Sequence, residues 1–194
     1  RLFQILDLEH ESNKGSGLSL KRLAGHVEFR QVRFRYGSGP ELFRDMNFCI
    51  PLGKTTGIVG MSGCGKSTIA ALLCAEYLPS WGSLRFNNCD IRQINKSSLR
   101  SRISIVPQQI ELFSGSILEN IAAGELDPDT DKLLRLAART GLMKLIDTLP
   151  AGIYTELGEH GLNLSGGERQ RLAFTRALYR EPEMLILDEA TSNV

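Results

Sequence analysis

The chain lacks the patterns that mark membrane-spanning, secreted and metal-binding proteins. Its longest apolar run, residues 69–75, is far shorter than the ~20 residues that cross a bilayer. No secretory signal is present, so we expect the thiols to be reduced, as they are in the cytosol. No C-x-x-C pair occurs and the histidines are scattered, so a zinc site is not expected. The residues concerned are Cys49, Cys64, Cys74, Cys89, His10, His26 and His160.

A strong charge of either sign is also missing. The 194 residues include 23 Lys and Arg against 22 Asp and Glu, so no net field draws the molecule toward nucleic acid or an acidic membrane. The 42% of hydrophobic residues can supply the core of one ordinary domain, which excludes a disordered or fibrous chain. Because the sequence begins at Arg1 rather than Met and stops at Val194 in the middle of a pattern, we expect a piece of a longer protein.

What the sequence does contain is the element order of an α/β nucleotide-binding fold. The polar, glycine-broken residues 11–17 are typical of a linker. Alternating apolar residues predict a strand over residues 27–36 with an interruption. Further strands are predicted at residues 46–50, 55–59, 84–86, 103–106 and 184–187, and helices at residues 66–77, 97–102, 116–122, 129–140, 143–149 and 165–179. The helices in the middle of the chain form a predicted insertion in the α/β domain.

A phosphate-binding loop is the strongest local motif. Residues 60–67 read Gly-Met-Ser-Gly-Cys-Gly-Lys-Ser, which is a glycine, any four residues, then Gly-Lys-Ser, between a predicted strand and a predicted helix. The glycines let successive backbone N–H groups turn toward phosphate oxygens, and the helix N-terminus adds its dipole. Lys66 would reach the β- and γ-phosphates and Ser67 would ligate Mg²⁺. The alternative is a plain glycine turn, which the flanking strand and helix disfavour.

Two carboxylates follow the predicted strand at residues 184–187. Asp188 and Glu189 would lie at the carboxyl edge of a sheet, which faces the ligand crevice of α/β folds. Asp188 would hold Mg²⁺ through its hydration shell, and Glu189 would orient or deprotonate the attacking water. A solvated strand end would explain this pair equally well by itself. The phosphate loop is what favours the catalytic interpretation.

Residues 164–170, Leu-Ser-Gly-Gly-Glu-Arg-Gln, open the predicted helix at residues 165–179. Ser165 with Glu168 three residues later forms a capping box, which a well-started helix alone would explain. Gly166 and Gly167 cost helix stability, however, and are useful mainly where a backbone must approach a ligand closely. The N-terminus of this helix therefore suits a γ-phosphate.

Together these motifs resemble the nucleotide-binding domain of an ATP-binding cassette (ABC) transporter of the exporter type, over about residues 27–194. The string that contains Ser165 is similar to the family's signature motif. Tyr36 stands where the family places an aromatic residue that stacks on adenine, although an ordinary strand-end tyrosine is the alternative. Gln108 resembles the family's glutamine, which reaches the metal and the attacking water and faces the coupling elements of the membrane domain. Gln109 beside it is the competing candidate.

Other segments fall in the family's order. Residues 155–161 resemble a loop of exporters thought to touch the coupling helices, residues 190–194 resemble the start of the D-loop, and residues 1–7 resemble the segment that leaves the last transmembrane helix. The implied fold is a P-loop NTPase core, a mainly parallel sheet flanked by helices, with an N-terminal antiparallel strand region. The family's switch histidine would follow residue 194, so we expect a C-terminally truncated domain. The expected divisions are a linker at residues 1–24, the ABC domain at residues 25–194 and its helical subdomain at about residues 109–164.

The resemblance implies an ATPase that powers export across a membrane through a fused or associated transmembrane domain, at the cytoplasmic face of the cell membrane. Two such domains meet head to tail in this family, and each ATP lies between the phosphate loop of one and the signature motif of the other. The expected cofactors are ATP and Mg²⁺, nucleic acid is not an expected partner, and the truncated chain alone is expected to be inactive. The implied site residues are Glu189, Gln108 and Lys66 for catalysis; Tyr36, Gly60, Ser62, Gly63, Cys64, Gly65, Lys66, Ser67, Thr68, Ser165, Gly166 and Gly167 for the nucleotide; and Ser67, Gln108 and Asp188 for the metal.

Two other functions fit parts of the pattern. A soluble ABC-type ATPase acting on DNA or ribosomes is disfavoured by the balanced charge, by the exporter-like loop and by the short helical region where chromosome-type relatives carry a long coiled coil. The second alternative, a P-loop kinase that transfers phosphate to a metabolite, does not explain the motif at residues 164–170. A basic row on the last predicted helix, Arg169, Arg176 and Arg180, is expected to be a solvated face.

Overall fold

The structure is a computed structural model that describes residues 17–158 and 164–188. It divides into two compact units, residues 1–102 and residues 103–194. Several expected features lie outside the described residues: the segment at residues 1–7, the end of the exporter-like loop at residues 159–161, Glu189, and the D-loop at residues 190–194. None of the helices formed by the described residues combines the length and apolarity that a bilayer crossing requires.

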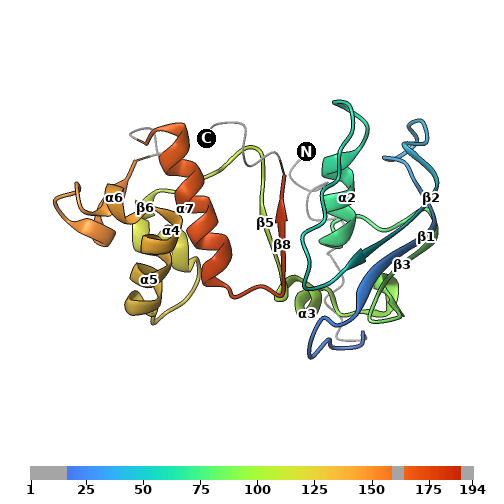
Figure 1. Ribbon diagram of the computed structural model, residues 1–194, viewed down its shortest axis with the longest axis horizontal. Coiled ribbons are helices and arrows are strands. Elements are labelled where there is room, and N and C mark those ends of the chain that lie inside the picture. The colour runs from blue at the N-terminus through green and yellow to red at the C-terminus, as the bar shows by residue number, and fades with distance from the viewer. Residues whose placement is uncertain (1–16, 159–163, 189–194) are drawn as a thin grey trace, which may run out of the picture. The chain divides into compact units, whose positions relative to one another are not determined.

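The first unit is built on an antiparallel sheet, as expected for the N-terminal region. Its strands lie in the order β2-β1-β3-β4. Figure 1 labels the first three of them. The elements of this unit are β1 (His26–Phe34), β2 (Phe43–Pro51), α2 (Lys66–Leu73), β3 (Trp81–Phe86), β4 (Cys89–Asp90), the 3-10 helix η1 (Ile91–Gln93) and α3 (Lys96–Arg100). Apolar side chains on alternate residues of β1, namely Val27, Phe29 and Val32, are almost fully buried.

The interruption predicted in the first strand is a bulge. Gln31 has a φ of 48°. The register of β1 shifts between Phe29 and Val32 against β2, and between Arg30 and Arg33 against β3. The backbone N–H of Gln31 donates to Oδ1 of Asn47 on β2 at 2.8 Å, so a side chain replaces the lost ladder bond. The extra residue keeps Val32 and Phe34 facing the core.

The prediction of a strand at residues 55–59 is wrong. These residues form neither helix nor strand, and Val59 is 94% exposed. Their apolar pattern is typical of a strand, but no segment in the described part of the chain pairs with them, and a strand needs a partner for its backbone groups. The helix predicted at residues 66–77 is also too long. The backbone turns to a φ of 54° at Ala75, and the guanidinium of Arg100 donates to the carbonyls of Cys74 and Ala75, both at 3.0 Å.

The second unit combines a parallel pair of strands with a helical insertion between them in the sequence. Strands β5 (Ile103–Val106) and β8 (Met184–Leu187) pair in parallel, with Val106 opposite Leu187. Between them come β6 (Gly115–Ser116), α4 (Ile117–Ala122), α5 (Thr130–Thr140), α6 (Met143–Ile146), the 3-10 helix η2 (Gly152–Tyr154), β7 (Glu156–Leu157) and α7 (Gly166–Tyr179). Helices α4, α5 and α7 pack side by side (Figure 1), and their fully buried residues include Ile117, Ile121, Leu133 and Leu172.

Local residues cap both ends of α5. Asp129 caps its start by accepting from the backbone N–H of Lys132 at 2.8 Å. The glycine directly after the helix predicted at residues 129–140 indicates its end, and Gly141 does end α5 with a φ of 76°. The helix predicted at residues 143–149 ends three residues early, at Ile146. The unbroken apolar residues 184–187 predict a buried strand, but β8 is not buried, since Leu187 is 48% exposed. Its one partner among the described residues is β5.

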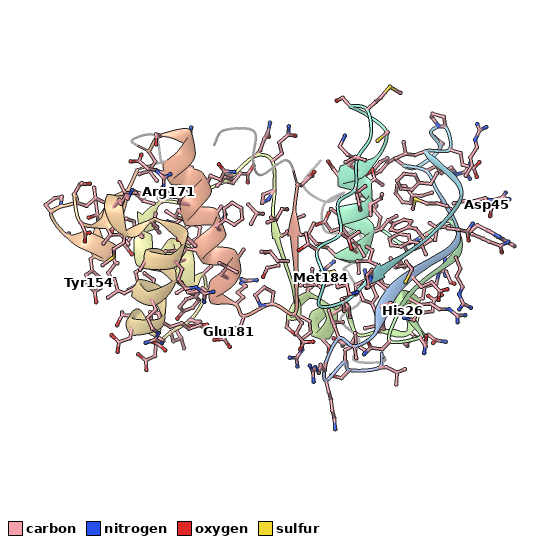
Figure 2. The ribbon with its side chains drawn as sticks, in the orientation of Figure 1. His26, Asp45, Tyr154, Arg171, Glu181 and Met184 are labelled. Carbon is pink, nitrogen blue, oxygen red and sulfur yellow. The ribbon has the colours of Figure 1, made fainter. Side chains whose placement is uncertain are left out.

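A buried tyrosine fixes the C-terminal end of α7. Tyr179 is 2% exposed; its hydroxyl accepts from the backbone N–H of Asp129 at 2.8 Å and donates to a carboxylate oxygen of Glu125 at 2.9 Å. The ammonium of Lys132 lies 4.7 Å from the ring centroid and forms an ion pair with Glu181, which is labelled in Figure 2. Burial and the Glu125 carboxylate raise the pKa of Tyr179. The start of α5 is therefore tied to the end of α7.

Candidate functional site

The loop at residues 60–67 takes a backbone shape that its glycines make possible. Gly63 has a φ of 78°, and Gly65, at the N-cap of α2, has a φ of 97°. Residues other than glycine rarely adopt such backbone angles without strain. A Cβ on Gly65 would lie 2.6 Å from Cε1 of Phe43, so this glycine also lets the loop rest directly on an aromatic ring. The loop is therefore held in place from beneath.

The lysine of this loop folds back across it. The Nζ of Lys66 donates to the carbonyl oxygens of Gly60 and Met61, each at 3.1 Å. The ammonium thus lies over the loop, where a phosphate group would be surrounded by backbone N–H groups and a positive charge. Ser67 is exposed and begins the helix beside Lys66, so its hydroxyl is accessible to a cation.

The N-terminus of α2 has no anionic group of its own. Gly65 offers no side-chain cap, and the first turn of this helix contains no acidic residue. The first N–H groups of a helix lack partners inside the helix and carry a partial positive charge. An external anion such as phosphate would satisfy both the N–H groups and the dipole.

Tyr36 lies next to this loop in the first unit. Its hydroxyl is 2.9 Å from Oγ1 of Thr68 in the first turn of α2. Its ring packs edge to face against Phe34, with centroids 4.8 Å apart, and against Tyr77, with centroids 5.1 Å apart. Tyr36 is 46% exposed, so part of the ring is open to a planar ligand. The sequence nominated Tyr36 and Thr68 separately; their contact spans 32 residues and has no local signal.

In the second unit, the structure brings Gln108 and Asp188 to the same end of the parallel strands. The backbone N–H of Asp188 donates to the carbonyl of Val106 at 3.0 Å, which extends the β5–β8 pairing by one residue. Gln108 follows Val106 by two residues and is exposed. Carboxylate and amide oxygens are ligands that suit Mg²⁺. Residues 17–158 and 164–188 contain no cluster of three or more His, Cys, Asp or Glu side chains that could bind a metal unaided.

The helix α7 begins with the predicted capping box. The hydroxyl of Ser165 accepts from the backbone N–H of Glu168 at 3.3 Å and donates to the Glu168 carboxylate at 2.7 Å. The backbone N–H of Ser165 donates to the same carboxylate at 2.7 Å. The Ser165 hydroxyl and N–H hold the pKa of Glu168 below its ordinary value. A Cβ on Gly166 would meet nothing within 4 Å, so this turn is open to an approaching group.

The basic row predicted as a solvated face on α7 is only partly one. The guanidinium of Arg176 donates to the carbonyl of Glu111 at 3.1 Å, and burial lowers the pKa of this arginine. Arg176 therefore attaches α7 to the segment that follows Gln108. Arg171, labelled in Figure 2, lies closer to the start of the helix, with Nη1 3.4 Å from the position of a Cβ on Gly167.

The phosphate loop, its lysine and the strand-end carboxylate define a P-loop nucleotide-binding protein. The sequence profile of the family described as "ABC transporter" matches residues 43–192, and the chain belongs to this family. It is 42% identical over 194 residues to the ABC multidrug transporter mdr2 of Aspergillus fumigatus, an alignment of 99% of this chain and 24% of that protein. It is likewise 42% identical over 193 residues to the ATP-dependent lipid A-core flippase of Pectobacterium atrosepticum, with 98% of this chain and 33% of that protein covered.

A solved structure agrees with these sequence relatives. The structure of a bacterial Atm1-family ABC exporter with ATP bound is 35% identical to this chain and matches it with a TM-score of 0.87. The match covers 100% of this chain and 34% of the exporter. The resemblance to an exporter-type nucleotide-binding domain with a P-loop NTPase fold is therefore confirmed. The chain spans about a quarter to a third of the length of the relatives named here.

Proposed function

We propose that the protein binds ATP with Mg²⁺ and hydrolyses it, and that hydrolysis powers export of a substrate across a membrane. The observation that carries this proposal is the N-terminus of α2, where Lys66 crosses a glycine loop that brings no anion of its own. Such a site binds a phosphate chain through backbone N–H groups and one fixed positive charge. The family match and the ATP-bound exporter of similar structure support the same conclusion.

The proposed roles follow from the chemistry of each side chain. Lys66 neutralises the β- and γ-phosphates and assists catalysis. Ser67 and Gln108 supply oxygen ligands to Mg²⁺, and Asp188 holds the ion through its hydration shell. The ion would add positive charge at the developing leaving group. Glu189 is the general base for the attacking water, and Tyr36 stacks on the adenine. The loop residues that surround the phosphates are Gly60, Ser62, Gly63, Cys64, Gly65 and Thr68.

The proposed assembly is a head-to-tail pair of nucleotide-binding domains. Ser165, Gly166 and Gly167 of one domain contact the γ-phosphate bound by the other, which is consistent with the open space at Gly166. Residues 25–194 belong to this domain, and residues 1–24 link it to a transmembrane domain on the same polypeptide. The domain would then work at the cytoplasmic face of the membrane.

The full-length protein tests these roles through two substitutions. Lys66→Ala should weaken MgATP binding itself, because the phosphates lose their fixed positive charge. Glu189→Gln should keep binding and abolish turnover, because only the base is lost. Lys144→Ala, at an exposed lysine of α6, is the matched control and should change neither quantity. An unchanged hydrolysis rate in Glu189→Gln would remove this residue from its proposed role.

A further inference from the structure

Tyr36 is held in one orientation by contacts on several sides. Phe34 and Tyr77 meet its ring at interplanar angles of 86° and 89°, and Phe34 also meets Tyr77 with ring centroids 5.8 Å apart. Edge-to-face contacts of this kind are directional, so the three rings fix one another. The hydroxyl at the far end of the ring contacts Thr68, 2.9 Å away. A side chain that is 46% exposed is therefore held more firmly than its exposure suggests.

Thr68 connects this ring to the phosphate loop. It follows Lys66 and Ser67 in the first turn of α2 and is only 6% exposed, so its hydroxyl has little access to bulk water. A hydroxyl has one proton to donate and two lone pairs to accept with. A phenol is the stronger acid of the two, which favours donation from Tyr36 to Thr68. The Thr68 hydroxyl can then donate its own proton to another acceptor.

We propose that Thr68 is a positioning residue that links the base and phosphate parts of the nucleotide site: the Tyr36 hydroxyl donates to Oγ1 of Thr68, and the Thr68 hydroxyl donates to a phosphate oxygen. The bond to Oγ1 of Thr68 helps to fix the Tyr36 ring where it meets the base, so losing this bond weakens the contact with the base and leaves the Thr68 donor to the phosphate in place. The inference rests on the proposed nucleotide binding and adds a coupling within that site. A complete nucleotide gains from the link, whereas a phosphate chain without a base does not use the Tyr36 ring.

Four variants of the full-length protein separate the link from its parts. Tyr36→Phe keeps the ring and removes only the hydroxyl. Thr68→Val keeps the shape of the side chain and removes both the link and the phosphate donor. The double variant, Tyr36→Phe with Thr68→Val, completes a double-mutant cycle. Thr68→Ser keeps a hydroxyl at position 68. Tyr154→Phe removes a hydroxyl from a 62% exposed tyrosine of the second unit and is the matched control.

The experiment measures dissociation constants for MgADP and for magnesium pyrophosphate, neither of which requires turnover. One hydrogen bond is worth about 0.5–1.5 kcal/mol, so Tyr36→Phe should weaken MgADP binding about 2- to 12-fold and leave pyrophosphate binding unchanged. Thr68→Val should weaken both ligands, and adding Tyr36→Phe to it should cost nothing further. Thr68→Ser and Tyr154→Phe should bind both ligands like the wild type.

Three results would overturn the link. These are an unchanged MgADP affinity in Tyr36→Phe, an equal loss from Tyr36→Phe in the wild-type and Thr68→Val backgrounds, and an equal weakening of pyrophosphate by Tyr36→Phe. A wild-type protein that binds neither ligand would instead refute the proposed nucleotide binding. The unliganded melting temperature of each variant distinguishes these outcomes from unfolding, and the ratio of the two affinities is a quantity that a general loss of stability would not change.

Discussion

Two helices, α2 and α7, have glycines at their N-termini that the sequence predicts to lie near phosphate, but the two N-termini are capped differently. Helix α2 starts after Gly65 with no side-chain cap and no acidic residue in its first turn. Helix α7 starts after Ser165, and the carboxylate of Glu168 accepts from both the hydroxyl and the N–H of that serine. The first N-terminus requires an external anion, whereas the second already has an internal one.

This difference indicates that the N-termini of α2 and α7 have different roles in binding a nucleotide. An anion at α2 meets free N–H groups and the ammonium of Lys66. An anion at α7 meets a serine whose proton is already given to Glu168, so the serine must first exchange partners. We therefore expect α2 to bind nucleotide by itself and α7 to contribute only when the nucleotide is held by another domain.

Gly65→Ala should abolish nucleotide binding. The new Cβ would lie 2.6 Å from the Phe43 ring and would force alanine into a φ of 97°. Strain of this kind costs about 1–3 kcal/mol, and relieving it would move the loop away from the phosphate position. Titration with MgADP should show at least ~100-fold weaker binding, equivalent to about 2.7 kcal/mol. Gly53→Ala, at a φ of 74° with open space around the Cβ, is the control for backbone strain without overlap.

The thiol of Cys64 should report an anion at α2. Cys64 is exposed in the phosphate loop, whereas Cys74 at the other end of α2 is buried, and burial raises its pKa to about 11. Maleimide should therefore modify Cys64 at least ~100-fold faster than Cys74, since the thiolate reacts. Bound MgADP should slow this reaction, and the adduct should block nucleotide binding.

The matched probe for α7 is Ser165→Cys in a background where Cys64 is serine. MgADP has no γ-phosphate, so it should protect Cys64 in the wild type and leave the thiol introduced at position 165 of this variant as reactive as it is without nucleotide. Equal labelling of Cys64 with and without MgADP would contradict the idea that nucleotide occupies this loop.

Gly166→Ala should raise stability and lower hydrolysis. The glycine lies in the first turn of α7 and a Cβ there meets nothing within 4 Å, so alanine is accommodated and gains helix propensity of about 0.5–1 kcal/mol. If a nucleotide held by a second domain approaches this turn, the methyl group obstructs it. Urea unfolding and ATP turnover measured on the same samples separate the two effects. A variant that is both stabilised and fully active would show that nothing approaches Gly166 closely.

Much of this site was predictable because its signals are local. The phosphate loop, the capping box of Ser165 and Glu168, and the glycine that ends α5 each depend on neighbours within a few residues. Contacts between distant residues were not predictable, such as the hydroxyl pair of Tyr36 and Thr68. The strand expected at residues 55–59 failed for a related reason: an apolar pattern measures burial tendency, whereas a strand also requires a partner.

The smallest expected effect concerns the charge at the start of α7. The hydroxyl and N–H of Ser165 lower the pKa of Glu168 below the ordinary 4.5, so its carboxylate stabilises the folded state above that pH. This stabilisation is lost as the pH falls through the lowered pKa of the folded state, because the carboxyl group is then protonated in both the folded and the unfolded state. Glu168→Gln keeps a capping box, since glutamine can also accept from the serine, but it removes the charge.

The melting temperature of Glu168→Gln should therefore lie slightly below that of the wild type at pH 7, and the gap should shrink as the pH is lowered beneath 4.5. The analogous substitution in the capping box of α4, Glu119→Gln, should behave in the same way, because Ser116 also lowers the pKa of Glu119. The two variants should differ in hydrolysis, however. Without the internal carboxylate, the N-terminus of α7 resembles that of α2 and should accept a phosphate more readily, so Glu168→Gln should lower the KM for ATP while Glu119→Gln leaves it unchanged. An unchanged KM in Glu168→Gln would mean that the internal anion of α7 does not compete with the nucleotide.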